Sequence, residues 1–232
     1  DSRWGGKNYN GSSTMAAAGC GPTSVSMIAY NMNTKITPWD VAKFMKSHGY
    51  AVPNAGTAWA GIPAALKNFG CEKVHASTSM SDFFEHLAKG DGYSYGIILF
   101  RGGTKGGVKW TGSGHYIAVT DYKVKNGKHY LYTRDSGGYN HTGWYCYEDH
   151  MAGLIKQTWS CYVPMLNGEA RKKKKTEKKA AETWQVQLFS SSDKKKVEID
   201  ILLKQGFSMR EVAKRLNISH SHSMVHTKIL NT

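Results

Sequence analysis

One cysteine, Cys20, stands between two glycines in the stretch AGCGPTSVSMIAY, where an apolar helix is predicted to begin. Pro22 favours the first helical turn, and apolar residues follow it at helical spacing. At a helix N-terminus, unpaired backbone N–H groups and the helix dipole favour an anion such as a thiolate. Gly19 and Gly21 would let a substrate approach the sulfur. The alternative is that Cys20 is a small buried thiol without a catalytic role. A nearby base that could deprotonate the thiol would favour the catalytic role.

A histidine and an aspartate supply that partner. His115 begins the predicted strand GHYIAVTDYKV after the glycine-rich approach that ends at Gly114, and Asp135 ends the next strand. Asn126-Gly127 between the two strands is a hairpin signal. Counting residues back from this turn along both strands predicts that the side chains of His115 and Asp135 are neighbours. A carboxylate that holds a histidine, and a histidine that deprotonates a thiol, form a catalytic triad.

These motifs resemble the C39-like branch of the papain-like cysteine peptidases. The resemblance rests on GCGPTS before an apolar helix, GHYIAV, a strand that ends in Asp and the DSRWGGKNY opening, and it covers roughly residues 1–165. It implies a papain-like fold with Cys20 as nucleophile, His115 as base and Asp135 as orienting acid. It implies no cofactor, and Gly19 and Gly114 would border the bound substrate.

The oxyanion hole departs from the pattern that the resemblance implies. Papain-like enzymes usually supply a Gln side chain from a position ahead of the cysteine, but the first Gln here is Gln157. Three alternatives stay open. The Gln lies upstream of Asp1, a side chain of Thr14, Ser13 or Asn10 replaces it, or the backbone N–H of Cys20 acts alone. Losing one such donor typically costs ~10²–10³ in rate.

Other residues compete for roles at the site. Trp59 and Trp110 are candidates for lining the substrate cleft, although a place in the core is the commoner fate of an aromatic residue. Asp121 and Asp149 compete with Asp135, but Asp121 lies ~20 Å along the strand from His115. We expect surface or turn positions, and no metal ligands, for six further histidines. These are His48, His75, His86, His129, His141 and His150.

The composition limits the function classes. The 232 residues carry a net charge of +14, and the last 66 hold 15 Lys/Arg against 7 Asp/Glu. This balance suits a polyanion such as nucleic acid, an anionic lipid surface or a wall polymer. No apolar run approaches the length of a membrane span. Without an initiator Met or signal peptide, we expect a processed or excised piece that begins at Asp1.

The four cysteines are too few and too scattered for a disulfide framework. No CxxC motif occurs, so a structural zinc site is not expected. Cys146 and Cys161 lie in strand-like stretches and could pair if those strands were neighbours. Free buried thiols are the preferred interpretation.

Periodicity predicts helices first and an antiparallel sheet second, an α+β pattern. Besides the Cys20 helix, we expect helices at 39–48, opened by Thr37 and Pro38, at 57–68 and at 81–89. Runs rich in β-branched and aromatic residues predict four strands, at 93–100, 114–124, 128–135 and 158–166.

Three domains are predicted, a papain-like domain at 1–166, a basic flexible linker at 167–183 and a small all-α three-helix unit at 184–232. The last resembles a helix-turn-helix, with a helix ending at Gly206, another over 209–216 and a third near 224–230. DNA binding and wall binding both stay open for this unit. His220, His222 and His226 could hold a metal only opportunistically.

The sequence thus predicts a cysteine hydrolase that cuts an amide bond, most simply a peptidoglycan endopeptidase or amidase of a phage or bacterial lysin with a C-terminal wall-binding module. The expected partners are cell wall peptidoglycan or a peptide, with an anionic wall polymer or DNA at the basic C-terminal region. The expected location is secreted or cell-wall associated. The alternatives are a Gly-Gly leader-processing peptidase and a DNA-binding regulator with an inactive papain-like domain.

Overall fold

The computed structural model describes residues 2–32, 35–90, 92–137 and 139–164. Short helices and two small hairpins come first, and a large sheet follows, so the predicted α+β class is confirmed. The helices are α1 (Met15–Ala18), α2 (Cys20–Ala29), the 3₁₀ turn η1 (Tyr30–Met32), α3 (Pro38–Ser47), α4 (Gly61–Asn68), α5 (Met80–Lys89) and α6 (Tyr147–His150). The hairpins before the sheet pair β1 (Asn8–Asn10) with β2 (Ser13–Thr14), and β3 (Ala51–Val52) with β4 (Gly56–Thr57).

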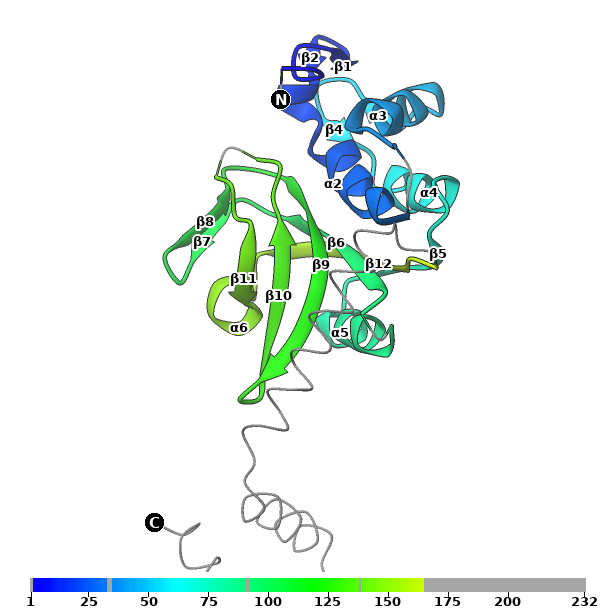
Figure 1. The fold of residues 1–232 in the computed structure, drawn as a ribbon. Coiled ribbons are helices and arrows are strands. Elements are labelled where there is room, and N and C mark those ends of the chain that lie inside the picture. The colour runs from blue at the N-terminus through cyan, green and yellow to red at the C-terminus, as the bar shows by residue number, and fades with distance from the viewer. Residues whose placement is uncertain (1, 33–34, 91, 138, 165–232) are drawn as a thin grey trace, which may run out of the picture. The chain divides into compact units, whose positions relative to one another are not determined.

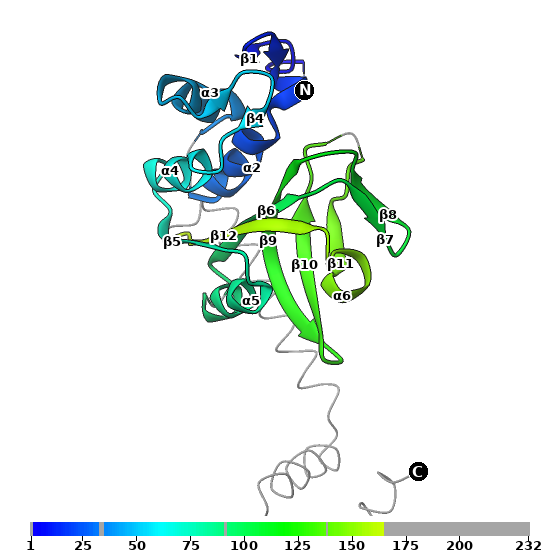
Figure 2. The same ribbon diagram turned by 180° about the vertical axis from the view of Figure 1, so that it is seen from behind.

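Six strands form one antiparallel sheet in the order β11-β10-β9-β6-β12-β5. They are β5 (Glu72–Ser77), β6 (Ser94–Phe100), β9 (His115–Lys125), β10 (Lys128–Arg134), β11 (Gly143–Cys146) and β12 (Ile155–Tyr162). A further hairpin, β7 (Gly103–Lys105) with β8 (Val108–Thr111), connects β6 to β9. Figure 1 shows α2, α3 and α4 gathered beside the sheet, and the reverse view in Figure 2 shows the same grouping.

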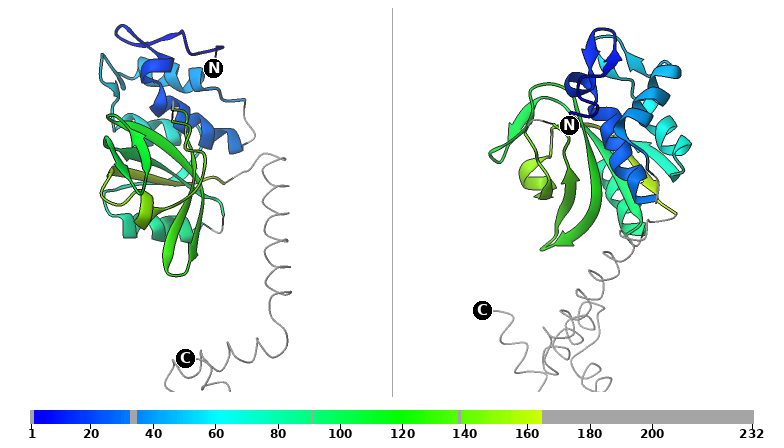
Figure 3. Two further views of the ribbon diagram at one scale, coloured as in Figure 1. Left: turned by 90° about the vertical axis from the view of Figure 1, so that its left-hand side faces the viewer. Right: turned by 45° about the horizontal axis from the view of Figure 1, so that its top comes forward.

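The two faces of the sheet bury different cores. Because successive side chains of a strand point to opposite faces, Tyr116 packs with the helices α2, α3 and α4, whereas Ile117 packs with α5. The first core includes Ile28, Met45, Leu66 and Trp159, and the second includes Phe83, Ile98, Trp110 and Leu131. Figure 3 shows the blue and cyan helices next to the green sheet from two further directions. Helix α2, which begins with Cys20, thus lies directly against β9, which begins with His115.

Two local signals work as the sequence predicts. The Thr37 hydroxyl accepts from the backbone N–H of Asp40 at 3.2 Å, and the Asp40 carboxylate accepts from the N–H of Thr37 at 3.0 Å. This capping box, with Pro38 in the first turn, opens α3 and is typically worth ~0.5–2 kcal/mol. In the turn between β9 and β10, Asn126 and Gly127 both have positive φ, as a tight hairpin turn requires.

Four elements differ from what the sequence predicted. The helix expected over 57–68 begins at Gly61, because Gly56 and Thr57 form β4 and pair with β3. The last strand ends at Tyr162 rather than near residue 166. The edge strand β5 was not predicted, because its outer residues Glu72 and Lys73 are exposed and its apolar alternation is weak. The helix expected over 81–89 begins one residue earlier, after the Ser79 cap.

All four cysteines are free, and Cys146 and Cys161 are buried, as the preferred interpretation predicted. Their strands, β11 and β12, are separated in the sheet by β10, β9 and β6, which excludes the pairing. Within the described part of the chain, no helix has the length and apolar character needed to cross a lipid bilayer. The predicted linker and three-helix unit lie outside the described residues.

Candidate active site

Cys20 is the first residue of α2, as the sequence predicted, and it follows directly on the short helix α1. The tight link between the helices explains the flanking glycines. A Cβ on Gly19 would lie 2.5 Å from the carbonyl oxygen of Met15, and a Cβ on Gly21 would lie 2.4 Å from Oγ1 of Thr57. The carbonyl of Gly19 accepts from the hydroxyl of Thr23 at 2.7 Å. These packing contacts fix the backbone on both sides of the sulfur.

His115 and Asp135 are in contact, as the hairpin register predicted. The distance between Nε2 of His115 and Oδ1 of Asp135 is 2.7 Å, and the Asp135 side chain is fully buried. The carboxylate also accepts from the backbone N–H of Gly137 at 2.7 Å and from that of His141 at 3.0 Å. Three donors therefore hold it in one orientation. With Nε2 engaged by Asp135, Nδ1 of His115 is the nitrogen left for proton exchange with Cys20.

Gly137 closes over this pair. A Cβ at this position would lie 2.7 Å from Nε2 of His115 and 3.0 Å from Oδ1 of Asp135, too close for any side chain without a shift. The absence of a side chain lets the backbone of the loop after β10 cover the hydrogen bond. Sequence reasoning missed Gly137, although its place in the motif RDSGG, two residues after Asp135, is a signal for close backbone approach.

The surroundings of His115 favour its protonated form. Burial by itself lowers the pKa of His115, but hydrogen bonds with Asp135 and Cys20, and the negative charges of both, raise it to about 9. Burial raises the pKa of Asp135, but the hydrogen bonds from His115 and from two backbone N–H groups bring it below the usual value. Asp135 is thus a carboxylate that stabilises imidazolium beside Cys20.

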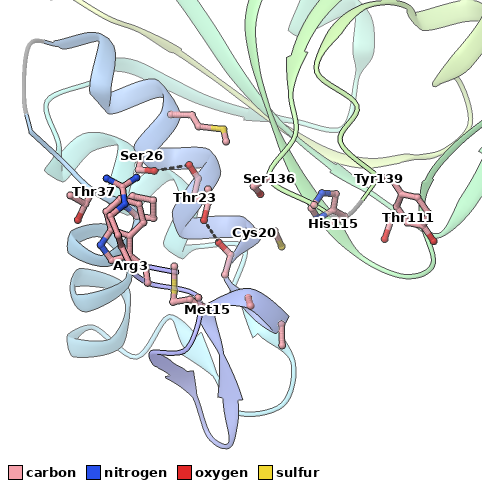
Figure 4. Close-up of a pocket in the computed structure, with 18 of the residues that line it drawn as sticks. Arg3, Met15, Cys20, Thr23, Ser26, Thr37, Thr111, His115, Ser136 and Tyr139 are labelled. Carbon is pink, nitrogen blue, oxygen red and sulfur yellow. Dashed lines mark hydrogen bonds between the residues drawn. The ribbon is translucent and has the colours of Figure 1, made fainter. Parts of the chain in front are cut away.

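An open cleft of about 870 Å³ holds the pair. One wall follows α1, α2 and the segment before α3, and the other is formed by the residues before β9 and after β10. Figure 4 shows Cys20 and His115 facing each other from the helix and the sheet, with Ser136 and Tyr139 beside them. Arg3 and Lys35 are basic, and none of the lining residues of this described cleft is acidic. The cleft therefore suits a neutral or anionic chain.

Comparison with known proteins gives the family. The model of the Peptidase_C39 like family matches residues 7–164, about two thirds of the chain. The chain belongs to this family. No curated protein matches it in sequence. Among solved structures, it is similar to that of a protein from Bacillus anthracis assigned as a C39-like peptidase, with 14% identity and a TM-score of 0.40 over 62% of this chain and 88% of that one. Family membership supports a cysteine peptidase in general.

Within this C39-like domain, only some of the predicted substrate-binding residues line the cleft. Gly19 and Gly114 line the cleft. Trp110 lines it as well, but its side chain is buried, stacked on Phe100 with its indole N–H donated to the carbonyl of His150. Trp59 is 51% exposed and is not among the cleft residues, so the structure does not bring it to the candidate site.

The two competitors of Asp135 are placed elsewhere. Asp149 pairs with Lys128 at 2.7 Å, and the Asp121 carboxylate accepts from the backbone N–H of Tyr122. In the described part of the chain, neither forms a hydrogen bond or ion pair with His115, whose carboxylate partner is Asp135. The contact of Asp135 with His115 is the one that the hairpin register predicted, and its role as orienting acid stays a prediction.

The structure also reduces the number of candidate donors for the oxyanion hole. The side-chain amide of Asn10 donates to the carbonyls of Val52 and Gly56, at 2.7 and 3.0 Å, and is buried away from the cleft. Asn10 is therefore wrong as a donor. Ser13 and Thr14 form β2 and are not among the cleft residues. Of the alternatives inside the described chain, the backbone N–H of Cys20 remains.

Proposed function

We propose that this chain is a cysteine hydrolase that cleaves an amide bond with Cys20 as nucleophile, His115 as proton carrier and Asp135 as the orienting carboxylate. The observation that supports it is the meeting, in one open cleft, of a helix-terminal cysteine and a histidine fixed by a buried carboxylate. This arrangement is the one that nucleophilic catalysis by a thiol needs.

The reaction follows from the charge state of the pair. The Cys20 thiolate attacks the carbonyl carbon of the scissile amide, and the imidazolium of His115 gives its proton to the leaving nitrogen. The C–N bond breaks and a thioester forms, with release of the amine. Neutral His115 then takes a proton from water, and the hydroxide attacks the thioester. The carboxylic acid leaves and the thiolate–imidazolium pair is restored.

The substrate proposed is peptidoglycan, cut in its stem or cross-bridge peptides, as in a phage or bacterial lysin that acts at the cell wall. The charge of the protein supports this choice. The cleft carries Arg3 and Lys35 and no acidic lining residue, and the whole chain has a net charge of +14. A cationic protein is attracted to anionic wall polymers. The basic segment after residue 166 is proposed to bind such a polymer.

Purified bacterial cell walls test the proposal. The full chain is incubated with walls, and the released fragments are identified by mass together with their new end groups. Amide cleavage creates new amino groups without new reducing sugar ends. The matched control is Cys20→Ala, which removes one sulfur atom from the cleft and should release nothing.

Two results would contradict the proposal. Release of fragments by Cys20→Ala would exclude the assigned nucleophile. The second result has two parts: cell walls stay intact, and peptides that carry a Gly-Gly leader end are cleaved in a Cys20-dependent way. It would support the same chemistry but identify the function as leader processing.

A further inference from the structure

A second group of side chains outside the cleft brings three metal-binding atoms together. His75 lies on β5, and Asp82 and His86 lie one turn apart on α5, which follows β5 directly. Nε2 of His75 is 2.7 Å from Oδ2 of Asp82, and Nε2 of His86 is 3.5 Å from Oδ1 of the same carboxylate. All three donor atoms lie within 4.8 Å of one another. None of these residues lines the cleft that holds Cys20.

The spacing suits a small transition-metal ion. Ligand atoms around tetrahedral Zn²⁺, with bonds of ~2.0–2.2 Å, lie roughly 3.4 Å apart. The separation between His86 and Asp82 already matches, and that between His75 and Asp82 needs to widen by a fraction of an ångström. Two imidazoles and one carboxylate are a zinc ligand set, and water can fill the fourth position.

The local structure orients the ligands. Asp82 sits in the first turn of α5, where its backbone N–H donates to the hydroxyl of Ser79 at 3.3 Å. This cap fixes the start of the helix and with it the backbone of Asp82. His86 follows Asp82 by four residues and so shares its helix face. The backbone of His75 is held by pairing with Ser160 of β12.

The two imidazole rings stack, with centroids 4.4 Å apart and planes 10° from parallel. A metal ion lies in the plane of each imidazole that binds it, so sharing one ion requires the rings to turn out of this stack. Both side chains are about two-fifths exposed, which leaves room for that rotation. Metal binding should therefore change the environment of both rings, and this change is measurable.

We propose that His75, Asp82 and His86 form a Zn²⁺-binding site that ties strand β5 to helix α5. This differs from the sequence-based expectation that neither histidine is a metal ligand. The sequence separates His75 from His86 by eleven residues, and only the turn between β5 and α5 brings them together. An ion that binds the folded chain stabilises it, so Zn²⁺ should raise its melting temperature.

Calorimetric titration with zinc chloride, on the full-length chain, tests the proposal. A Cys20→Ala background removes the sulfur that could capture zinc in the cleft, and makes the test independent of the proposed hydrolase. We expect one saturable Zn²⁺ site per chain, a melting temperature that rises with Zn²⁺ but not with Mg²⁺, and NMR shifts of the ring signals of His75 and His86. His86→Asn and Asp82→Asn should each weaken binding at least tenfold.

Matched variants decide the location. His48→Asn removes another exposed imidazole, and a His220→Asn, His222→Asn, His226→Asn triple variant removes the C-terminal cluster. Both should bind Zn²⁺ as the parent does. Circular dichroism checks that His86→Asn and Asp82→Asn are folded, and the NMR shifts in the parent report on the site without any substitution. Three results would each overturn the proposal. They are unchanged Zn²⁺ affinity in both His86→Asn and Asp82→Asn, loss of Zn²⁺ binding in the triple variant, and ring signals of His75 and His86 that do not shift when Zn²⁺ is added.

Discussion

The hydroxyl of Ser24 donates a hydrogen bond to the backbone carbonyl of Tyr116 at 3.0 Å, and both residues are buried. Ser24 lies one turn after Cys20 on α2, and Tyr116 directly follows His115 on β9. The bond therefore joins the helix that carries the nucleophile to the strand that carries the base. It holds the two halves of the candidate site at a fixed separation.

Ser24→Ala should thus lower kcat more than it changes KM. Loss of one buried hydrogen bond costs about 1 kcal/mol, which lowers the melting temperature by roughly 2–4 °C in a domain of this size. The matched control is Ser47→Ala, since the Ser47 hydroxyl contacts only near neighbours in the chain, the carbonyl of Phe44 and the ring of His48. Steady-state kinetics on a peptide and thermal melts check the prediction. Equal kcat in the two variants would show that the bond does not position the site.

Gly137→Ala should reduce activity while the fold persists. The added methyl would lie 2.7 Å from Nε2 of His115, so the ring or the loop must move. A misplacement approaching 1 Å can cost on the order of 10² in rate. Gly112→Ala is the control, because a Cβ there meets nothing within 4 Å. Comparable kcat/KM in both variants would mean that the loop yields without disturbing His115.

The pH dependence follows from the raised pKa of His115. The imidazolium that protonates the leaving nitrogen is lost as the pH rises through about 9, so kcat/KM should fall there. The same sign applies to stability. The folded pKa exceeds the unfolded value of 6.5, so the contribution is complete below pH 6.5 and is lost as the pH rises toward 9.

Asp135→Asn removes the hydrogen bond to a carboxylate and the negative charge that raise this pKa, so the alkaline limb should move to lower pH. Rates measured for the parent and the variant from roughly pH 6 to 11 locate this limb in each. An alkaline limb that stays in place in Asp135→Asn would assign it to another group.

Local patterns carried most of what the sequence predicted. The Asn126-Gly127 turn fixes the β9–β10 hairpin, and counting from it was enough to bring His115 beside Asp135. The helix that begins with Cys20 was similarly readable from Pro22 and the apolar spacing. In each case the determining contacts lie within one hairpin or one helix.

The features that the sequence did not predict depend on packing between segments that are distant in sequence. Trp59 and Trp110 are chemically alike, and only the fold buries one beside the cleft and exposes the other. Gly137 matters because the loop after β10 folds back onto His115. The short edge strand β5 is defined by pairing with β12, so its own weak pattern did not reveal it.

Removal of residues after Leu166 should leave catalysis on a small soluble peptide unchanged. Every described element remains in the shortened chain, including β12, which lies between β6 and β5, and Val163, whose side chain is fully buried in the first core.

The removed segment holds 15 Lys/Arg against 7 Asp/Glu, and its stretch from Arg171 to Lys179 has no apolar side chain at all. Its expected contribution is attraction to an anionic surface, which raises the local concentration of the domain. Release from intact walls should therefore weaken on truncation, most at low salt, because exposed charges are screened beyond ~10 Å at 0.1 M salt. Peptide turnover and wall release, each measured for both chains across salt concentrations, separate the two effects. Loss of peptide turnover, or unfolding on truncation, would make the segment part of the catalytic fold and refute the predicted domain boundary.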